Sequence, residues 1–421
     1  MSNDVPSATG PLAGLRIVEL GAIFAGPMVG THLGDLGAEV IKIEPDRGDD
    51  VRRLGSAKSG VPLWWKLVAR NKRLVGIDLA RTEGADVLLR IIARADVVVE
   101  NFRPGKLESW GIDYAAIQRV NPRAILLHVS GYGRIGPYRD FPGFGTLAEA
   151  FSGFAYTNGQ PDGPPVLPAF PIADHVTALF GTQSVLAALY ERQVSGRGQE
   201  IELNLYECLL ALMGNMAINY DQLGQIMQRR GNRSKFSVPR NAYRTRDDRW
   251  VVISSTTDSV AKRLFLAIGR PDLADDPDLA TNPQRAARAD EIDGIMAAWI
   301  RERSQAVVLE TLRAQHVAVA PINNIAQFVA DPHVVATGTL EEHTDPDLGT
   351  VHIPRVVPRF SRTAGAIRWT GRLEVGCDTR AVLAEVGFSN TEIDRLADAG
   401  IITVSAGALP SQLLSPRSRK P

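Results

Sequence analysis

Short apolar runs alternate with longer amphipathic patterns over the first 130 residues of the chain. The short runs are rich in Val and Ile and have the length of buried strands, whereas the longer patterns repeat their apolar positions with the period of a helix. We predict strands at 15–20, 39–44, 96–101 and 124–130, and helices at 26–36 and 83–95. Strands that alternate with helices indicate a parallel sheet covered by helices. The sequence therefore predicts an α/β fold with a Rossmann-like start.

The pattern beyond residue 130 predicts a continuation of this sheet and then a second unit. Residues 131–172 are rich in Gly, Pro and aromatic residues with weak periodicity, which indicates a long ordered loop system near a site. Further elements are expected as a helix at about 175–192, a strand at 200–207, a helix through about 222, a strand at 249–255 and helices near 258–268 and 290–314. From about residue 350 onward we expect mainly helix.

These patterns divide the chain into three segments. Residues 1–224 are expected to form most of a large Rossmann-like domain, and residues 225–335 a smaller α+β domain. Residues 336–421 are expected to return to the large domain and to end in a mobile tail. The first ten residues are also expected to be mobile, since they are mostly small or polar. A length of 421 residues fits two or three domains of ordinary size.

The composition is that of an ordinary globular protein without net charge. The 47 basic and 47 acidic residues cancel, which removes the general electrostatic argument for binding nucleic acid or an anionic membrane. The two cysteines, Cys208 and Cys377, lack metal or redox spacing and suit a reducing compartment. The start lacks a signal-peptide pattern, and no apolar run reaches the ~18 residues of a membrane span. We therefore expect a cytoplasmic protein with neither nucleic-acid nor membrane partners.

The first strand-to-helix turn indicates whether the predicted sheet binds a dinucleotide. It reads ELGAIFAGPMVG, with glycines at 21, 26 and 30, whereas a dinucleotide site needs G-x-G-x-x-G so that the backbone can approach the pyrophosphate. Glu44 does lie at the end of the second strand, where a ribose-binding acid would lie. A NAD-dependent dehydrogenase therefore stays open as an alternative. Paired cysteines, H-E-x-x-H and G-x-S-x-G are absent, and the seven histidines lack ligand spacing, so the sequence predicts no metal site.

One carboxylate stands in front of a long helical pattern. Asp174 follows the proline-rich stretch PPVLPAFPIA and precedes an apolar run that is expected to be buried. It would fall at the N-cap or in the first turn of that helix, where Asp commonly accepts backbone N–H groups. A helix N-terminus also keeps a carboxylate ionised, and apolar neighbours would protect a reactive acyl intermediate from water. Capping and nucleophilic attack are both open on this evidence.

A series of longer motifs resembles the family III CoA-transferases, the CaiB/BaiF type that includes formyl-CoA transferase and the carnitine and bile-acid CoA-transferases. In order, the motifs are PLAGLRIVELGAIFAGP, LGAEVIKIEP, NKRLVGIDL, VVVENFRPGKLESWGI, NPRAILLHVSGYGRIGPY, EAFSGFAYTNGQPDGPP, ADHVTALFGTQSVLAALYERQVSGRGQEIELNLYE and LAEVGFSNTEIDRLADAGII. They extend over nearly the whole chain. The resemblance implies a large Rossmann-like domain built from both chain ends, a smaller second domain and an interlocked homodimer.

In such enzymes an aspartate carries the reaction, and the matching residue here is Asp174. The resemblance implies that its carboxylate attacks the donor acyl-CoA to give an aspartyl mixed anhydride, which the CoA thiolate converts into an aspartyl-CoA thioester. A small carboxylic acid then accepts the CoA. No metal and no permanently bound cofactor is implied, because coenzyme A or acyl-CoA is itself the substrate. The implied CoA-binding residues are Phe24, Ala25, Lys72, Arg73, Asn101, Phe102 and Arg103.

Departures from the family patterns narrow the expected substrates. Pro45 stands where formyl-CoA transferase has a CoA-contacting arginine, and RGNRSKFSVPRNAYR at 230–244 stands in the region of the glycine-rich loop that shields its active site. These two departures disfavour formyl-CoA and oxalate. The related α-methylacyl-CoA racemases use a G-H-D triplet, whereas this chain has G-F-G at 143–145 and lacks that histidine base. A racemase of the same fold, despite the missing histidine, and a CoA-binding protein without turnover are the remaining alternatives to a CoA-transferase. The stretch GFGTLAEAFSGF instead resembles the subgroup that moves CoA between succinyl-CoA and acids such as malate, mesaconate, citramalate or benzylsuccinate. The implied acyl-site candidates are Phe144, Gly145, Thr146 and Glu149.

Overall fold

The structure of the protein, a computed structural model, describes residues 10–405 and divides into two compact units. Unit 1 draws on three stretches of the chain, which run up to Phe154, from Leu167 to Gln222 and from Thr339 onward. Unit 2 comprises Ala155–Val166 and Leu223–Gly338, so it includes a short stretch that precedes the predicted boundary. Of the terminal segments expected to be mobile, the first ten residues and the tail from Ser405, all but Gly10 and Ser405 lie outside the described residues.

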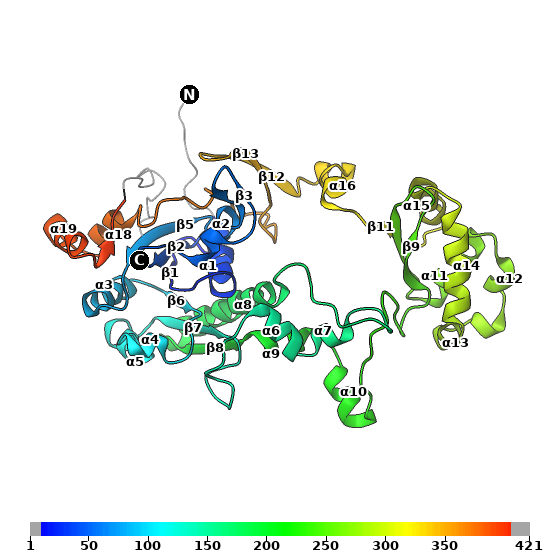
Figure 1. Ribbon diagram of the computed structural model, residues 1–421, viewed down its shortest axis with the longest axis horizontal. Helices are drawn as coiled ribbons and strands as arrows, with labels where there is room; N and C mark the ends of the chain where they lie inside the picture. The colour runs from blue at the N-terminus through cyan, green and yellow to red at the C-terminus, as the bar shows by residue number, and fades with distance from the viewer. Residues whose placement is uncertain (1–9, 406–421) are drawn as a thin grey trace. The chain divides into compact units, whose positions relative to one another are not determined.

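Unit 1 is built around a seven-stranded sheet with the order β14-β5-β2-β1-β6-β7-β8 (Figure 1). The strands are β1 (Arg16–Glu19), β2 (Glu39–Glu44), β5 (Lys72–Ile77), β6 (Val97–Glu100), β7 (Ile125–Ser130), β8 (Glu200–Asn204) and β14 (Ile402–Thr403). All neighbours pair in parallel except β14, which is antiparallel to β5. The α/β prediction is confirmed, although β5 and β14 were not predicted. The strand order reverses between β1 and β6, and ligands of such sheets bind beyond the strand ends at that reversal.

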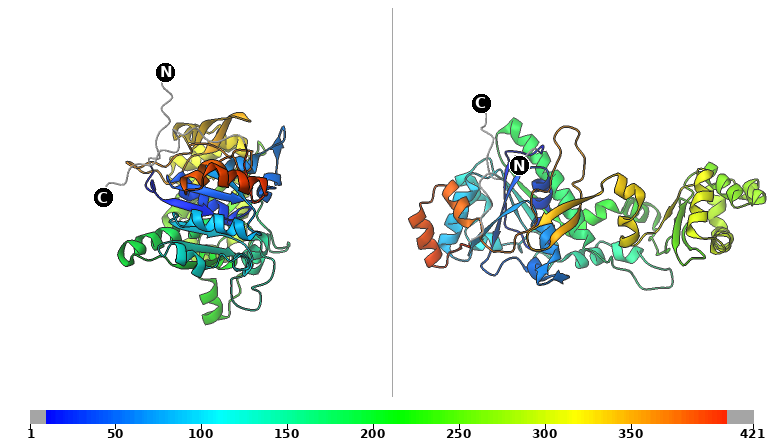
Figure 2. Two further views of the ribbon diagram at one scale, coloured as in Figure 1. Left: turned by 90° about the vertical axis from the view of Figure 1, so that its left-hand side faces the viewer. Right: turned by 90° about the horizontal axis from the view of Figure 1, so that it is seen from above.

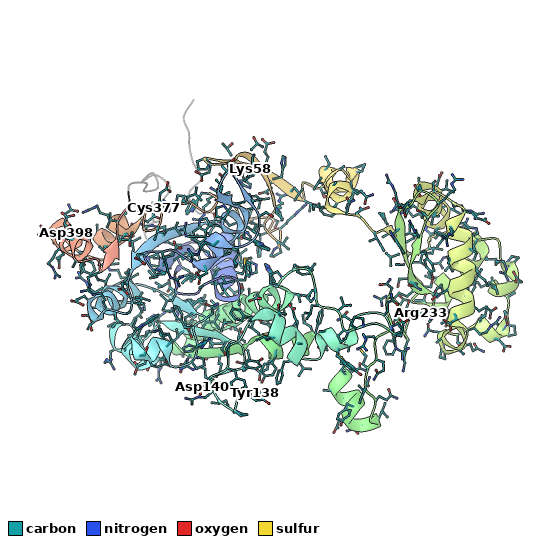
Figure 3. All side chains as sticks on the ribbon, in the orientation of Figure 1. Lys58, Tyr138, Asp140, Arg233, Cys377 and Asp398 are labelled. Carbon is teal, nitrogen blue, oxygen red and sulfur yellow. The ribbon has the colours of Figure 1, made fainter. Side chains whose placement is uncertain are left out.

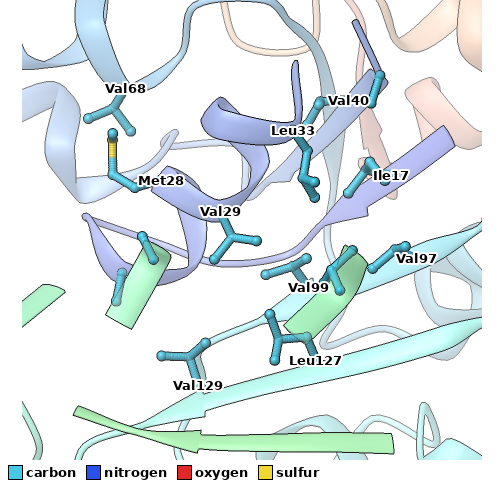
Figure 4. Packing of buried hydrophobic residues seen from close by; sticks show 14 of the residues in the cluster. Ile17, Met28, Val29, Leu33, Val40, Val68, Val97, Val99, Leu127 and Val129 are labelled. Atoms are coloured by element: carbon cyan, nitrogen blue, oxygen red, sulfur yellow. The ribbon is translucent and has the colours of Figure 1, made fainter. Parts of the chain in front are cut away.

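Alternate strand residues enter two hydrophobic cores, one on each face of the sheet. Ile17 of β1 packs with helices of one face, whereas the next residue, Val18, packs with helices of the other. The first set is α1 (Ala25–Asp35), α2 (Leu63–Val68), α8 (Ile172–Ser195) and α9 (Leu205–Leu212), and the second set is α3 (Thr82–Ile92), α5 (Tyr114–Val120), α18 (Thr379–Glu385) and α19 (Asn390–Asp398). Figure 4 shows the first core, where Val29 and Leu33 of α1 lie over the strands. Figure 2 shows the orange and red α18 and α19 beside the blue and cyan elements that begin the chain.

Three parts of unit 1 differ from the predicted elements. The expected loop system at 131–172 contains two short helices, α6 (Gly145–Phe151) and α7 (Phe154–Thr157), although the stretch that carries Tyr138 and Asp140 is an exposed loop (Figure 3). The helix expected through 222 is broken into α9 and α10 (Met216–Leu223). The C-terminal segment opens with a hairpin of β12 (Leu340–Asp345) and β13 (Gly349–Pro354). The remaining short elements are η1 (Asp50–Arg53), β3 (Ala57–Lys58), β4 (Val61–Pro62) and α4 (Lys106–Ser109).

Unit 2 contains a three-stranded antiparallel sheet in the order β11-β10-β9. Its elements are β9 (Arg240–Arg244), β10 (Trp250–Ser254), β11 (Val319–Pro321), α11 (Asp258–Ala267), α12 (Pro271–Ala274), η2 (Pro277–Leu279), α13 (Asn282–Ala287), α14 (Ala289–Arg301), α15 (Gln305–Ala314), α16 (Ile325–Val329) and α17 (Pro332–Ala336). The single helix predicted at 290–314 is wrong, because Ser304 caps α15 as a separate helix by accepting the N–H of Val307. Among the described residues, no helix has the length and apolar character needed to cross a membrane.

Candidate active site

Asp174 lies in the first turn of α8 but does not cap it. The helix begins at Ile172 after Pro171, so Asp174 is the third helical residue. Glu149 of α6 takes the capping role instead, because its carboxylate accepts the N–H groups of Ile172 and Ala173, the latter at 3.4 Å. Since α8 leads back to the start of β8, its N-terminus lies at the edge where the parallel strands end. The Asp174 carboxylate is thus at the ligand-binding edge and is not used as an N-cap.

Two further helix N-termini meet the Asp174 carboxylate. Helix α1 begins at Ala25, and the backbone N–H of Ala25 donates to the carboxylate. Helix α6 begins at Gly145, where an added Cβ would lie 2.1 Å from Oδ2 of Asp174. Only a residue without a side chain therefore leaves room for the carboxylate. Because peptide dipoles favour negative charge at helix N-termini, this arrangement suits an anion.

Burial gives the Asp174 carboxyl group an unusual acidity. Desolvation raises its pKa to about 6, the neighbouring Glu149 adds to the rise, and the bond from Ala25 opposes it. Glu149 is itself only 2% exposed, and burial raises its pKa too. Asp174 is therefore mainly ionised at neutral pH but is poorly hydrated. A carboxylate in this state is suited to nucleophilic attack on an acyl group.

An aromatic wall borders the carboxylate on the side of α1 and α2. The ring centroids of Phe24 and Trp64 are 4.8 Å apart with the edge of one ring toward the face of the other, and the ring of His175 lies 6.4 Å from each. Burial, and then the charge of Arg70, lower the pKa of His175. His175 is therefore mainly neutral at neutral pH, and the three rings form one aromatic cluster beside the first turns of α1 and α8.

The predicted acyl-site residues of α6 differ in exposure. Gly145 is buried against α8, whereas Phe144 is 59% exposed and Thr146 is exposed as well. Gly143 meets Gly131 backbone to backbone, since a Cβ added to Gly143 would lie 2.5 Å from Cα of Gly131. The two glycines of the G-F-G triplet thus allow α6 to approach both the end of β7 and the α8 carboxylate, which sequence reasoning did not predict.

The loop after β6 is joined to the turn after β1. Asn101 accepts the N–H of Ala22 at 2.8 Å and donates to its carbonyl oxygen at 2.9 Å. Phe102 packs against Trp110 with ring centroids 5.1 Å apart and joins the second core. Arg103 is exposed. Of the three residues predicted here to bind CoA, Arg103 presents a cation to solvent, whereas Asn101 and Phe102 hold the loops in place.

Lys72 and Arg73 are enclosed by the fold, contrary to the expectation that they bind CoA phosphates. Each is 1% exposed. The Nζ atom of Lys72 lies 2.6 Å from Glu19 and donates to the carbonyl oxygen of Pro27, and Arg73 pairs with Glu385 at 2.8 Å. Buried cations need such partners to offset lost hydration. The structure therefore argues against phosphate contact at both positions.

The acid that motivated the dehydrogenase alternative is also occupied. Glu44 is 1% exposed. It accepts from the Arg52 guanidinium at 2.8 and 2.9 Å and from the N–H of Asp49 at 2.8 Å. Its carboxylate is therefore not available to a ribose hydroxyl, and the dehydrogenase interpretation loses the residue on which it depended.

Other residues around the site were not predicted. Trp64 of the aromatic wall is one of two consecutive tryptophans, a pattern that could have drawn attention. Lys42 and Asp49, buried below the β1–α1 turn, gave no local signal in the sequence.

Both cysteines, Cys208 and Cys377, are buried and unbridged. Within residues 10–405, no group of three or more His, Cys, Asp or Glu side chains could hold a metal ion.

Comparison with known proteins gives consistent results. A family model described as CoA-transferase family III matches residues 12–379. The succinyl-CoA–L-malate CoA-transferase beta subunit of Chloroflexus aurantiacus is 40% identical over 95% of this chain and 100% of that protein. The succinyl-CoA–D-citramalate CoA-transferase of the same organism is 40% identical over 86% and 90%, and the human succinyl-CoA:glutarate CoA-transferase is 31% identical over 93% and 90%. A crystal structure of a CaiB/BaiF family protein from Brucella suis matches with a TM-score of 0.80 and 31% identity, covering 90% of this chain and 100% of that one.

Proposed function

The chain belongs to CoA-transferase family III, and on that premise we propose that it moves CoA from succinyl-CoA to a free dicarboxylic acid through a covalent intermediate on Asp174. The substrate class is supported by the relatives, whose names give succinyl-CoA together with citramalate, malate or glutarate. The observation that carries the role of Asp174 is the meeting of three helix N-termini at one desolvated carboxylate.

The proposed reaction has four acyl transfers. An Asp174 oxygen attacks the thioester carbonyl of succinyl-CoA, the C–S bond breaks, and CoA leaves as a thiolate, which leaves a mixed anhydride. The thiolate attacks the Asp174 carbonyl carbon and releases succinate, which gives an aspartyl-CoA thioester. A carboxylate of the acceptor attacks this thioester and again releases the thiolate. The thiolate finally attacks the acceptor's carbonyl in the new anhydride, which yields the product CoA ester and restores the Asp174 carboxylate.

The surroundings of Asp174 supply what these steps require. Each transfer passes through a tetrahedral anion, and the Ala25 N–H together with the helix N-termini stabilises negative charge at that place. The anhydride and the thioester are sensitive to hydrolysis, and the wall of Phe24, Trp64 and His175 limits the access of water. Proton transfer is not needed in any of the four steps, in agreement with a neutral His175 beside the carboxylate.

We place the CoA molecule at the reversal of strand order, between the turn after β1 and the loop after β6. Phe24 and Ala25 border the reactive thioester, and Arg103 contributes a cation for the phosphates. Asn101 and Phe102 serve this site by holding the two loops. Phe144 and Thr146, on the exposed side of α6, are the proposed contacts of the acceptor.

We further propose a cytoplasmic homodimer. Helices α8 and α10 expose large apolar side chains, with Leu179 at 60%, Tyr190 at 73%, Ile218 at 66% and Tyr220 at 63%. Large apolar side chains that remain exposed in one chain are those that an interface between subunits would bury. Light scattering coupled to gel filtration should give twice the mass of one chain, and the mass of one chain would contradict the dimer. Two buried, unbridged cysteines fit a reducing compartment.

The test of the activity is a transfer assay with succinyl-CoA and a panel of free acids that includes malate, citramalate, mesaconate, itaconate and glutarate. New CoA esters are read by mass. Wild-type protein should form at least one dicarboxyl-CoA ester, and Asp174→Ala should form none. Asp140→Ala is the control, because Asp140 lies on the exposed loop and its side chain is 74% exposed. Equal transfer by wild type and Asp174→Ala would refute the proposed role of the carboxylate.

A further inference from the structure

The turn between β1 and α1 contains an unfavourable backbone conformation. Ile23 has a φ of 67°, in the left-handed region. Four other non-glycine residues share a positive φ in the described part of the chain, at Ser59, Asn71, Asp248 and His316. Ile23 is the β-branched member of this set, and β-branched residues are the least tolerant of this region. Such a conformation persists only where surrounding contacts enforce it.

Three side chains hold the turn, and each of them bonds to the backbone of one residue in the stretch 21–23. The Nζ atom of Lys42 donates to the carbonyl oxygen of Gly21 at 2.9 Å. Asn101 brackets Ala22, as described above. Oδ1 of Asp49 accepts the N–H of Ile23 at 3.0 Å. The strained residue itself is therefore bound by Asp49.

Asp49 is in turn fixed by buried partners. Its Oδ2 atom lies 2.7 Å from the Nζ atom of Lys42, and its own N–H donates to Glu44 at 2.8 Å. Asp49 is 3% exposed and Lys42 is fully buried. Burial alone would lower the pKa of Lys42, but Asp49 and Glu19 together hold it above the ordinary value, so the ammonium group stays charged. The pair is a fixed ionic anchor beneath the turn.

The turn determines where two parts of the active site lie. Phe24, which follows Ile23, is the N-cap residue of α1 and belongs to the aromatic wall. Ala25 begins the helix and directs its N–H to the Asp174 carboxylate. A change of φ at Ile23 from the left-handed region to an ordinary region would turn both the Phe24 ring and the Ala25 N–H away from Asp174. The strain at Ile23 is thus linked to the geometry at the reactive carboxylate.

We propose that Asp49, anchored by Lys42, is a positioning residue of the transfer reaction, which holds Ile23 in the left-handed conformation so that Phe24 and Ala25 face Asp174. The inference rests on the proposed function, because it assigns Asp49 a role in the same reaction. Because Asp49 is only 3% exposed, it is not placed to touch substrate. It acts through the backbone of Ile23, and its loss should lower kcat more than it raises KM for succinyl-CoA.

The test is a double-mutant cycle between Asp49→Asn and Ile23→Gly. Glycine adopts positive φ without strain, so the turn should need Asp49 less in the Ile23→Gly background. In Asp49→Asn the side chain keeps one carbonyl oxygen but loses the ion pair between Oδ2 and Lys42, so that oxygen is no longer anchored against the Ile23 N–H. The variant should lower kcat about tenfold or more in the wild-type background, as misplacement of reacting groups does. The same change should cost less than about threefold when glycine is at position 23. A merely structural role of Asp49 predicts the same loss of kcat in both backgrounds.

Asp378→Asn is the matched control. Asp378 is fully buried and accepts the N–H of Leu74 at 2.7 Å, away from the turn. It should lower the melting temperature and leave kcat unchanged. An equal loss of kcat with Asp49→Asn in both backgrounds, or no loss at all, would overturn the inference. Absence of transfer by the wild type would instead refute the proposed function, so the two failures are distinguishable.

Amide hydrogen exchange keeps the inference testable if Asp49→Asn does not fold. In the wild-type protein, the amides of Ala22, Ile23 and Ala25 each have an acceptor within the site. They should exchange much more slowly than the amides of the exposed loop around Asp140. Exchange of the turn as fast as that loop would show that the turn is not held, and would overturn the inference as well.

Discussion

Replacement of Gly145 by alanine should disable the Asp174 carboxylate without unfolding unit 1. A Cβ at this position would lie 2.1 Å from Oδ2 and 3.1 Å from Cγ of Asp174, whereas real Cβ contacts essentially never fall below 3.0 Å. The carboxylate must therefore move by at least 3.0 − 2.1, or about 0.9 Å. A displacement of about 1 Å at a reacting group commonly costs a factor of about 100 in rate. We expect kcat for CoA transfer to fall by about that factor.

The fold should tolerate this change better than the reaction does. Gly145 is the first residue of α6, and its φ lies outside the left-handed region. Alanine is favoured over glycine in a helix by up to about 1 kcal/mol, which offsets part of the cost of the contact. The melting temperature should therefore change by less than about 3 °C.

Gly294→Ala provides the matched control for Gly145→Ala. Gly294 lies within α14, and an added Cβ would meet no heavy atom within 4 Å. This variant should keep full activity and gain up to about 1 kcal/mol of stability. Succinyl-CoA–dependent formation of the CoA ester is measured for both variants, together with thermal unfolding. If Gly145→Ala kept activity within threefold of wild type, the position of the Asp174 carboxylate could not be as critical as we argue.

Three further predictions concern charged groups. Asp174→Asn should stabilise the protein at pH 8, because the wild-type carboxyl has a pKa of about 6 when folded and 3.8 ordinarily. The folded wild type binds the carboxyl proton of Asp174 more tightly than the unfolded chain does. The free energy of unfolding of the wild type therefore falls by at most about 3 kcal/mol as the pH rises from about 4 to 6. Equal melting temperatures of wild type and Asp174→Asn at pH 8 would contradict this prediction. The kcat/KM of the wild type should fall about tenfold per pH unit below pH 6 as Asp174 becomes protonated, and a flat profile down to pH 5 would argue against an ionised nucleophile. Lys72→Met should lower the free energy of unfolding by about 3 kcal/mol or more, because it removes a buried partner of Glu19. Arg103→Ala should raise KM for succinyl-CoA and leave urea unfolding unchanged. If instead Lys72→Met raised KM without a loss of stability, and Arg103→Ala did the opposite, Lys72 would have to be a CoA-binding residue.

The sequence was informative where local pattern decides the structure. Strands β1, β2, β6 and β7 are short apolar runs, and each was predicted close to its observed bounds. Strand β5 was missed because it opens with Lys72 and Arg73, which resemble a solvated turn. Their partners, Glu19 and Glu385, are far away in the sequence, so the pattern around residue 72 could not indicate that the charges are neutralised.

At the candidate site, too, local sequence pattern predicted some features, whereas contacts between distant residues decided the others. The pattern around Asp174 predicted its place at the start of a helix, but not that Glu149 caps that helix. The closeness of Gly145 to the carboxylate is a contact between α6 and α8, and the strain at Ile23 is a property of the backbone. Long-range contacts and dihedral angles of this kind follow from the packed fold, and a linear pattern does not contain them.

The most direct test of the account is to trap the intermediate. Wild-type protein is incubated with succinyl-CoA in the absence of an acceptor, then treated with hydroxylamine, which converts an acyl anhydride or thioester into a hydroxamate, and digested for peptide mass spectrometry. A hydroxamate should form on Asp174, should require succinyl-CoA and should be absent from Asp174→Ala. Active transferase without modification at Asp174, or with modification at another residue only, would contradict the covalent mechanism.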